Sequence, residues 1–395
     1  MGIAGQQVTV IGAGVAGLAV SLALAQNGAE VTVLEQADAI REVGAGLQIS
    51  PNAACVLQAF GLGEALNALS LRAQAVELCD GRNGKQVLRL DLARLRPHQG
   101  YHFVHRADLI DLLASAARAT GVQIKLLQQI ETVDLSGPRP RVTTATGAEY
   151  TPSLLIGADG LHSKTRAALN GKVAPFFTRH VAWRTLIRCE PNAAPVAEIH
   201  MGAGRHLVSY PLRGGTLRNI VAVEERNTWV PESWSLRDDA SSMRQAFAGF
   251  SPRVQSWLDQ VQEPYLWGLF RHPVAKTWSK TLPEAAAVIL GDAAHPMLPF
   301  LAQGAAMALE DAWLLAHHLS RLPVPQALTA YQTQRAPRSA RVVAAANGNA
   351  RAYHLSGVQR SVAHAGLRLG NLIAPNLALK RFDWLYDYDV TRSDA

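Results

Sequence analysis

Three glycines and one acidic residue near the start of the chain could bind a nucleotide. Gly12, Gly14 and Gly17 follow the β-branched run at 8–11, and Glu35 lies 23 residues after Gly12. Gly12 permits a tight turn, Gly14 lets the backbone approach a pyrophosphate, and Gly17 lets the helix pack closely on the strand. The free N–H groups of the helix attract phosphate, and a carboxylate at Glu35 can accept from both ribose hydroxyls. The segment predicts a strand–turn–helix–strand unit that binds a dinucleotide.

A second segment about 280 residues later could hold the rest of a long cofactor. Asp292 follows the apolar run at 287–290, where its carboxylate can accept from ribityl hydroxyls at the carboxyl end of a strand. The loop at 299–305 leads into a helix whose first N–H groups, at Gly304 and Ala305, can face the pyrimidine edge of a flavin and stabilise negative charge there. Together the two segments indicate FAD, which is longer than one strand–helix unit can hold. An ordinary helix N-cap is the alternative interpretation of Asp292.

Composition and length narrow the class of protein. The chain has 395 residues, 48% of them hydrophobic and 17% charged, which predicts a folded protein with two domains or one large insertion. Its 38 basic residues are scattered without aromatic interleaving, which argues against nucleic-acid binding. Cys55, Cys79 and Cys189 have no metal-site or CxxC spacing, as expected in a reducing cytoplasm. Glycines interrupt the apolar stretch at 8–26, so we expect no stable membrane insertion.

Changes in residue composition and hydrophobic pattern along the chain predict an α/β fold. Residues 1–172 and 276–340 are expected to form a Rossmann-like FAD-binding domain. The β-rich residues 173–275 are expected to form an inserted β-sheet substrate domain, with a contribution from 72–100. Residues 341–395 are expected to form a helical C-terminal segment.

With these motifs in view, the chain resembles the single-component FAD-dependent aromatic hydroxylases, or group A flavoprotein monooxygenases. It resembles especially the salicylate hydroxylase and 3-hydroxybenzoate 6-hydroxylase branch. The resemblance covers nearly the whole chain and is sharpest in these segments: 12–17, 44–52, 157–163, 181–184, 210–212 and 291–311.

The resemblance implies a set of residues that contact FAD: Arg41, Gln48, Arg106, Asp159, Gly160 and Asp292. It further implies that Asp159 and Gly160 serve transiently bound NAD(P)H and that Pro299 lies beside the reactive edge of the flavin. No second glycine fingerprint exists for the nicotinamide nucleotide, which agrees with brief binding. The family often has an extra glycine where this chain has Ala302.

The implied reaction is hydroxylation of a small aromatic acid or phenol with NAD(P)H and O2, through a flavin C4a-hydroperoxide. Reduced flavin activates O2 without a metal, so we expect no metal site. Because the transferred oxygen is electrophilic, a base near the substrate hydroxyl would help, and His206 is the first candidate, although it could be structural. Tyr210 and Gln303 are alternatives as hydrogen-bonding groups. Arg184 could bind a substrate carboxylate or pair with an acid across the sheet, and Gln48 could also contact the substrate.

Two other functions stay open at this point. One is hydroxylation or epoxidation of a bulkier substrate, such as a quinone precursor or a polyketide. The other is a flavin-binding protein that does no oxygenation. We expect a cytoplasmic monomer or homodimer whose ring specificity and choice of NADH or NADPH the residue types leave undetermined.

Overall fold

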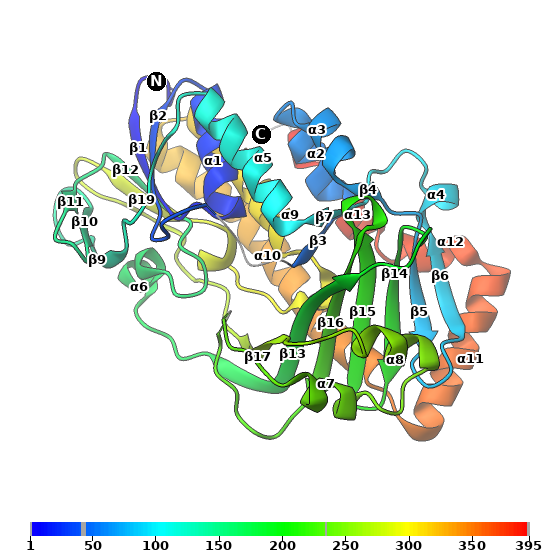
Figure 1. Ribbon diagram of the computed structural model, residues 1–395. Helices are drawn as coiled ribbons and strands as arrows, with labels where there is room; N and C mark the ends of the chain where they lie inside the picture. The colour runs from blue at the N-terminus through cyan, green and yellow to red at the C-terminus, as the bar shows by residue number, and fades with distance from the viewer. Residues whose placement is uncertain (1, 41–44, 234, 393–395) are drawn as a thin grey trace.

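Two large sheets lie side by side in the computed structural model, which describes residues 2–40, 45–233 and 235–392 (Figure 1). The first sheet has five parallel strands and an antiparallel edge strand. In spatial order its strands are β18 (Ser279–Thr281), β19 (Ala286–Ile289), β12 (Leu154–Gly157), β1 (Gln7–Ile11), β2 (Glu30–Leu34) and β8 (Gln123–Lys125). Parallel strands are buried on both faces, which explains their nearly continuous apolar runs.

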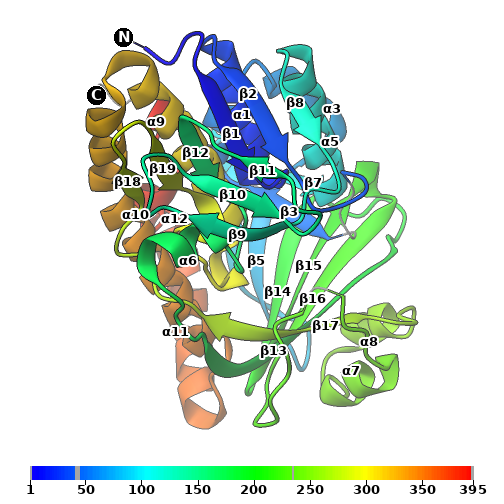
Figure 2. The same ribbon diagram turned by 90° about the vertical axis from the view of Figure 1, so that its left-hand side faces the viewer.

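Helices cover one face of this sheet and a small sheet covers the other. The helices on the first face are α1 (Val15–Gln26), α5 (Arg106–Ala119), α9 (Gly304–Arg321) and α10 (Val324–Tyr353). On the opposite face lies a small antiparallel sheet of β9 (Ile130–Asp134), β10 (Arg141–Thr144) and β11 (Glu149–Tyr150) (Figure 2). Helix α10 runs unbroken through residue 340, so the boundary predicted there falls inside a helix.

The second sheet has seven strands, all antiparallel to their neighbours except at the β14–β5 pair. In spatial order they are β17 (Tyr265–Arg271), β13 (Phe176–Arg188), β16 (Leu217–Glu225), β15 (Arg205–Leu212), β14 (Val196–Gly202), β5 (Ala75–Asp80) and β6 (Gln86–Asp91). Its outer face packs on α7 (Ala240–Ala246) and α8 (Pro252–Leu258) through a core that includes Trp183. The opposite face, called the inner face, is turned toward the first sheet. The strands at 75–91 therefore belong to the same sheet as those at 176–271.

Short elements join the two sheets. A three-stranded sheet of β3 (Gly46–Ile49), β7 (His102–His105) and β4 (Leu71–Arg72) lies between them. The chain between and after these strands forms α2 (Pro51–Ala59), α3 (Gly63–Leu69), α4 (Leu92–Leu95) and α6 (Lys164–Asn170). At the C-terminus, α11 (Gly357–Ile373), α12 (Pro375–Lys380) and α13 (Asp383–Tyr386) follow α10, and α11 and α12 pack along β6 (Figure 1). Within the described ranges, no helix has the length and apolarity needed to span a membrane.

Candidate active site

The glycine turn after β1 lies at the carboxyl edge of the parallel sheet. Strands β1, β12 and β19 run parallel, so the loops that follow them meet at one edge, where nucleotides bind in such sheets. Gly12 has a φ of 98°, and a Cβ there would lie 2.5 Å from the carbonyl oxygen of Ala158. The turn after β1 therefore packs directly on the turn after β12, and only glycine fits this contact.

Two long helices begin at this edge without a side-chain cap. The N-cap of α1 is Gly14, which has no side chain to form a cap. The N-cap of α9 is Gln303, whose side chain makes no capping hydrogen bond. A Cβ on Gly14 or on Gly304 would meet no atom of the described residues within 4 Å, whereas one on Gly17 would lie 1.9 Å from the carbonyl oxygen of Gly12. The first N–H groups of both helices, including that of Ala305, the second residue of α9, thus lack a side-chain cap. This arrangement fits a long anionic dinucleotide better than it fits a single phosphate.

The carboxylate of Glu35 is held in place at the end of β2. Its Oε2 accepts from the N–H of Ala13 at 2.7 Å, and its Oε1 accepts from the N–H of Ala37 at 2.9 Å. Each oxygen keeps a second lone pair that can accept from a hydroxyl. The acid at the distance expected from the glycines thus faces the glycine turn.

Asp159 and Gly160 form the turn after β12. The Asp159 carboxylate accepts from the hydroxyl of Ser163 at 2.5 Å and from the N–H of Thr165 at 3.1 Å, so it anchors the start of α6. Burial raises the pKa of Asp159, against the lowering effect of these bonds. Gly160 has a φ of 69° and open space beside its Cα.

Three charged side chains converge between the two sheets. Burial lowers the pKa of Arg106, at the start of α5, and the nearby Asp292 carboxylate opposes that shift. Burial raises the pKa of Asp292, while His295 and Arg106 lower it. On β13, burial and the Arg106 cation lower the pKa of Arg184 to about 10, and its guanidinium lies 5.1 Å from the ring centre of Trp267. Among the described residues, these two cations and one carboxylate lie close enough to shift one another's pKa.

Three residues that the sequence predicts to act on the substrate lie on the inner face of the seven-stranded sheet. Arg184 pairs with Val221 across β13 and β16, and His206 and Tyr210 lie four residues apart on the adjacent β15. Because opposed residues in an antiparallel pair point to the same side of a sheet, all three side chains project from the same face. Phe300, from the turn before α9, packs on this face.

Tyr210 and Gln48 lie at the junction of the inner face with β3. The Tyr210 ring is 5.0 Å from that of Phe103, and a Cβ on Gly46 would lie 2.5 Å from it. Burial raises the pKa of the Tyr210 hydroxyl. Gln48 accepts from the hydroxyl of Tyr101 at 2.7 Å, so its side chain is oriented before any ligand binds.

Sequence reasoning missed Asn219, which pairs with Tyr210 across β15 and β16. Its Oδ1 accepts from the N–H of Gly46 at 2.8 Å, and among the described residues its buried Nδ2 finds no hydrogen-bond partner. A buried donor without a partner costs free energy, and a ligand oxygen would relieve that cost. The one signal in the sequence is an asparagine inside a β-rich run, where this residue type is depleted.

Gln303 and Pro299 lie in the loop at 299–305, which leads into α9 and is called the flavin loop after its predicted role. The amide of Gln303 donates to Ser50 at 3.0 Å and accepts from Asn52 at 3.1 Å, so both of its groups hold this loop against α2. Pro299 opens a 3-10 turn, and the turn ends at Ala302 with a left-handed φ of 54°. Arg41 lies outside the described residues.

A family model described as FAD binding domain matches residues 6–346. The chain belongs to this family. It is 33% identical to the 3-hydroxybenzoate 6-hydroxylase of Klebsiella oxytoca over 89% of this chain and 90% of that protein. It is 32% identical to the 3-amino-4-hydroxybenzoate 2-monooxygenase PtnB3 of Streptomyces platensis, over 97% of this chain and 96% of the relative. The solved salicylate hydroxylase substrate complex has the same fold, with a TM-score of 0.81 and 24% identity over 98% of this chain and 97% of that one.

These findings confirm the α/β fold and the FAD cofactor predicted from the sequence. The flavoprotein is an aromatic monooxygenase whose co-substrate is NADH or NADPH. The glycine turn, the two helix starts and Glu35 lie at the carboxyl edge of the parallel sheet, and their contacts with FAD stay a prediction.

The turn after β19, residues 291–295, is anchored in this monooxygenase by a buried ionic cluster that the sequence did not reveal. Asp311 on α9 accepts from the N–H of Gly291 at 2.9 Å and pairs with His295 at 2.5 Å. Arg335 on α10 donates to Asp311 at 2.7 Å and also pairs with Glu310. Burial raises the pKa of Asp311, but His295 and Arg335 outweigh it and lower the pKa to about 2. The cluster thus ties α9 and α10 to the segment that carries Asp292.

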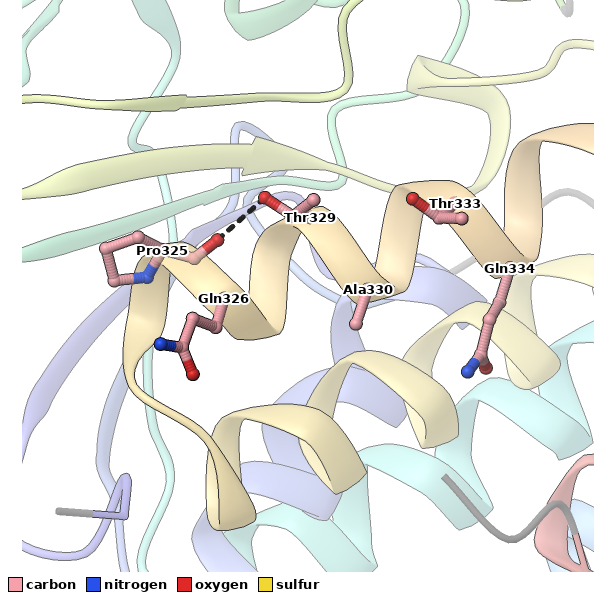
Figure 3. Close-up of a pocket in the computed structure, with 6 residues that line it drawn as sticks. All are labelled: Pro325, Gln326, Thr329, Ala330, Thr333 and Gln334. Atoms are coloured by element: carbon pink, nitrogen blue, oxygen red, sulfur yellow. Dashed lines mark hydrogen bonds between the residues drawn. The ribbon is translucent and has the colours of Figure 1, made fainter.

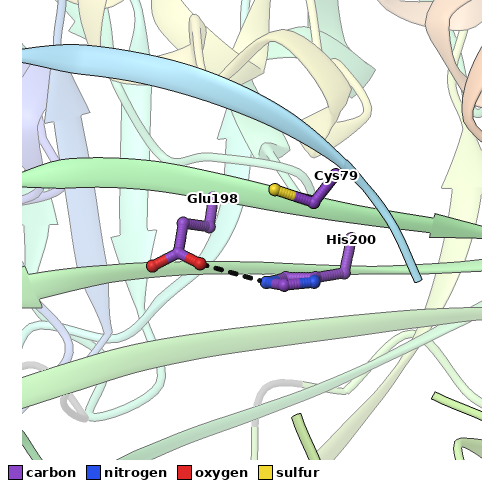
Figure 4. Close-up of side chains that lie close together, drawn as sticks. All are labelled: Cys79, Glu198 and His200. Carbon is purple, nitrogen blue, oxygen red and sulfur yellow. Dashed lines mark hydrogen bonds and ion pairs between the residues drawn. The ribbon is translucent and has the colours of Figure 1, made fainter. Parts of the chain in front are cut away.

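Two other features of the flavoprotein lie away from this edge. Cys79, Glu198 and His200 are close enough together to suggest a metal site (Figure 4). However, Glu198 already pairs with Arg253 at 2.8 Å, and burial raises the pKa of the Cys79 thiol to about 12, which disfavours a thiolate ligand. A shallow surface groove also runs along the first turns of α10, with these residues on its lining: Pro325, Gln326, Thr329, Ala330, Thr333 and Gln334 (Figure 3). That lining offers only neutral groups and none of the residues at the carboxyl edge.

Proposed function

We propose that this monooxygenase hydroxylates a small aromatic ring bearing a phenol and a carboxylate, bound on the inner face of the seven-stranded sheet. The observation that carries the proposal is the common face of Arg184, His206 and Tyr210, opposite Phe300 of the flavin loop. Relatives at 32–33% identity are named for 3-hydroxybenzoate and 3-amino-4-hydroxybenzoate, which both combine these two groups.

Arg184 is the proposed partner of the substrate carboxylate. A guanidinium matches a carboxylate in two parallel hydrogen bonds, and the nearby Arg106 adds positive potential. Asn219 lies two residues from the Arg184 partner on β16, and its free Nδ2 can donate to a substrate oxygen. The apolar surface of the sheet between Arg184 and Asn219, which includes Val221, suits an aromatic ring.

His206 is the proposed base for the substrate phenol. Burial, with His354 and His180 nearby, lowers its pKa well below the usual value, so its imidazole is neutral near pH 7 and can accept a proton. Tyr210 is proposed to orient the ring from the far end of the same strand, and Gln303 to position the flavin loop rather than to react.

FAD, when bound, supplies the electrons from NAD(P)H and the activated oxygen. The residues proposed to hold it are Gly12, Gly14, Gly17, Glu35, Arg41, Arg106, Asp159, Gly160, Asp292, Gly304 and Ala305, with Pro299 beside its reactive edge. The chain's own contribution is to bind, to orient the substrate and to move its proton. We also propose the domain division given above and a cytoplasmic monomer or homodimer.

The test is a screen of NAD(P)H oxidation with salicylate, 3- and 4-hydroxybenzoate and hydroxynicotinates, scoring hydroxylated product against peroxide. At least one hydroxybenzoate should give stoichiometric product. Arg184→Met should raise KM about tenfold to a hundredfold for that acid, from the ~1.5–3 kcal/mol of a charged hydrogen bond, but not for the matching phenol. Arg188→Met, at an exposed position on the same strand, is the control.

Peroxide without product from every acid would favour the bulkier-substrate alternative. Failure to oxidise NAD(P)H at all, with FAD bound, would favour a protein that does no oxygenation.

A further inference from the structure

A chain of hydrogen bonds connects His206 to the protein surface. Nδ1 of His206, on β15, lies 2.8 Å from Nε2 of His354, and Nδ1 of His354 lies 2.7 Å from Oε1 of Glu225, the last residue of β16. The side chain of Glu225 is 53% exposed, whereas that of His354 is 3% exposed. His206 is also buried. The path thus leads from solvent through one buried imidazole to another.

The hydrogen-bonding chemistry of these groups determines where their protons reside. An ionised carboxylate only accepts, so Nδ1 of His354 must carry a proton. In a neutral His354, Nε2 is then an acceptor, and Nδ1 of His206 must donate to it. The remaining nitrogen of a neutral His206, Nε2, is therefore a lone-pair acceptor. Glu225 thus prepares His206 as a base through two rings.

We propose that Glu225 and His354 are positioning residues that form a proton relay from His206 to solvent. The inference rests on the proposed function, in which His206 accepts the phenol proton of the substrate. The phenol O–H bond breaks as a bond forms to Nε2 of His206, and Nδ1 of His206 gives up its proton to Nε2 of His354. The Nδ1 proton of His354 then passes to Glu225 and on to water. No electrons change hands, and reprotonation of the product along the same path restores both tautomers.

The inner end of the relay lies against the flavin loop. The His206 ring is 5.6 Å from the ring of Phe300, which belongs to the turn Pro299–Leu301. The ring of Tyr353, at the end of α10, is 5.1 Å from His206 on another side. Aromatic walls exclude water from the buried imidazole, so a proton on His206 needs a path other than direct exchange.

The charges around His354 allow a proton to pass without being trapped. His354 is the C-cap of the 30-residue helix α10, where the helix dipole favours an imidazolium. Burial lowers the pKa of His354, Glu225 raises it, and His180 and Arg205 lower it. Further charged groups nearby in the described part of the chain include Glu224, which lies 3.7 Å from Arg205, and Arg271, which acts on His180 from β17. The carboxylate at the exposed end therefore draws the proton outward.

The first test needs no substrate. In FAD-loaded protein labelled with 15N-histidine, His206 should show its proton on Nδ1, and Glu225→Gln should change that signal to a mixture of tautomers. The control His364→Gln removes a buried histidine on α11 that pairs with Asp80 at 3.4 Å, and it should leave the His206 signal unchanged. A proton on Nε2 of His206 in the unmodified protein would overturn the relay, whether or not the protein hydroxylates anything.

The second test follows proton release with a pH indicator after rapid mixing with 3-hydroxybenzoate. His354→Gln and Glu225→Gln should slow proton release and kcat by about tenfold to a hundredfold, with KM and FAD affinity within about twofold. This loss is at or below the lower end of the range for general-base catalysis, because His206 itself is retained. Wild-type rates in both variants would overturn the proposal. If the unmodified protein binds no hydroxybenzoate, the proposed function fails, and the 15N signal alone decides the coupling.

Discussion

Replacing Asp311 with asparagine tests whether a buried carboxylate anchors the turn at 291–295, which carries Asp292. Asp311 is fully buried and accepts from Gly291, His295 and Arg335. Asparagine keeps one oxygen but loses the charge, and removal of one partner from a buried ion pair costs about 3–5 kcal/mol. Arg335 retains Glu310 as a partner, so we expect a loss near the lower end, about 3 kcal/mol.

The assay is denaturant and thermal unfolding of the apoprotein, with FAD affinity measured by flavin fluorescence. A chain of this length has an unfolding entropy of about 0.8 kcal/mol per degree, so Tm should fall by about 4 °C. FAD should bind about tenfold more weakly, because the Gly291 N–H loses a charged acceptor worth ~1.5 kcal/mol or more. The control is Asp111→Asn, an exposed position on α5.

The pH dependence of this variant gives an independent check. The pKa of Asp311 is about 2 in the folded protein against a usual 3.8, so its stabilisation is complete above pH 3.8 and is lost as pH falls toward 2. The stability difference between the two proteins should therefore shrink below pH 3.8, by about 2 kcal/mol. The reasoning is refuted if Asp311→Asn unfolds like the unmodified protein at pH 7 and binds FAD equally well.

Four further substitutions test particular contacts. Gly17→Ala should prevent folding around the glycine turn, because its Cβ would lie 1.9 Å from the Gly12 oxygen. Gly14→Ala should give the circular dichroism spectrum of a folded protein but should bind FAD weakly. Ala302→Gly should raise the free energy of unfolding by about 1 kcal/mol, since glycine adopts the left-handed φ of 54° without strain, and a lower value would contradict this. Burial lowers the pKa of His102 to about 4, so the stability that the neutral imidazole contributes is complete above pH 6.5 and is lost as pH falls toward 4. His102→Gln should reduce this pH dependence of the free energy of unfolding by up to about 3 kcal/mol. An unchanged slope would exclude His102 as its source.

The amino-acid sequence by itself determined the fold class and the cofactor. The glycines at 12, 14 and 17, the β-branched run before them and Glu35 all lie within about 30 residues, so local spacing carries their meaning. The place of Asp292 in a turn shortly after an apolar strand could also be predicted, while its contact with the cofactor stays a prediction. Each of these signals depends on one strand, one turn and one helix, and those are the structures that residue periodicity specifies.

Only the tertiary structure decided which side chains meet inside the molecule. His206 and His354 are 148 residues apart in sequence, and Gly46 meets Asn219 across 173 residues. Arg335 reaches Asp311 from the next helix, although nothing near either residue indicates the pair. These contacts arise where the register of two sheets and the packing of α9 on α10 bring separate elements together. A periodic pattern predicts which face of an element is buried, but not which residue lies opposite it.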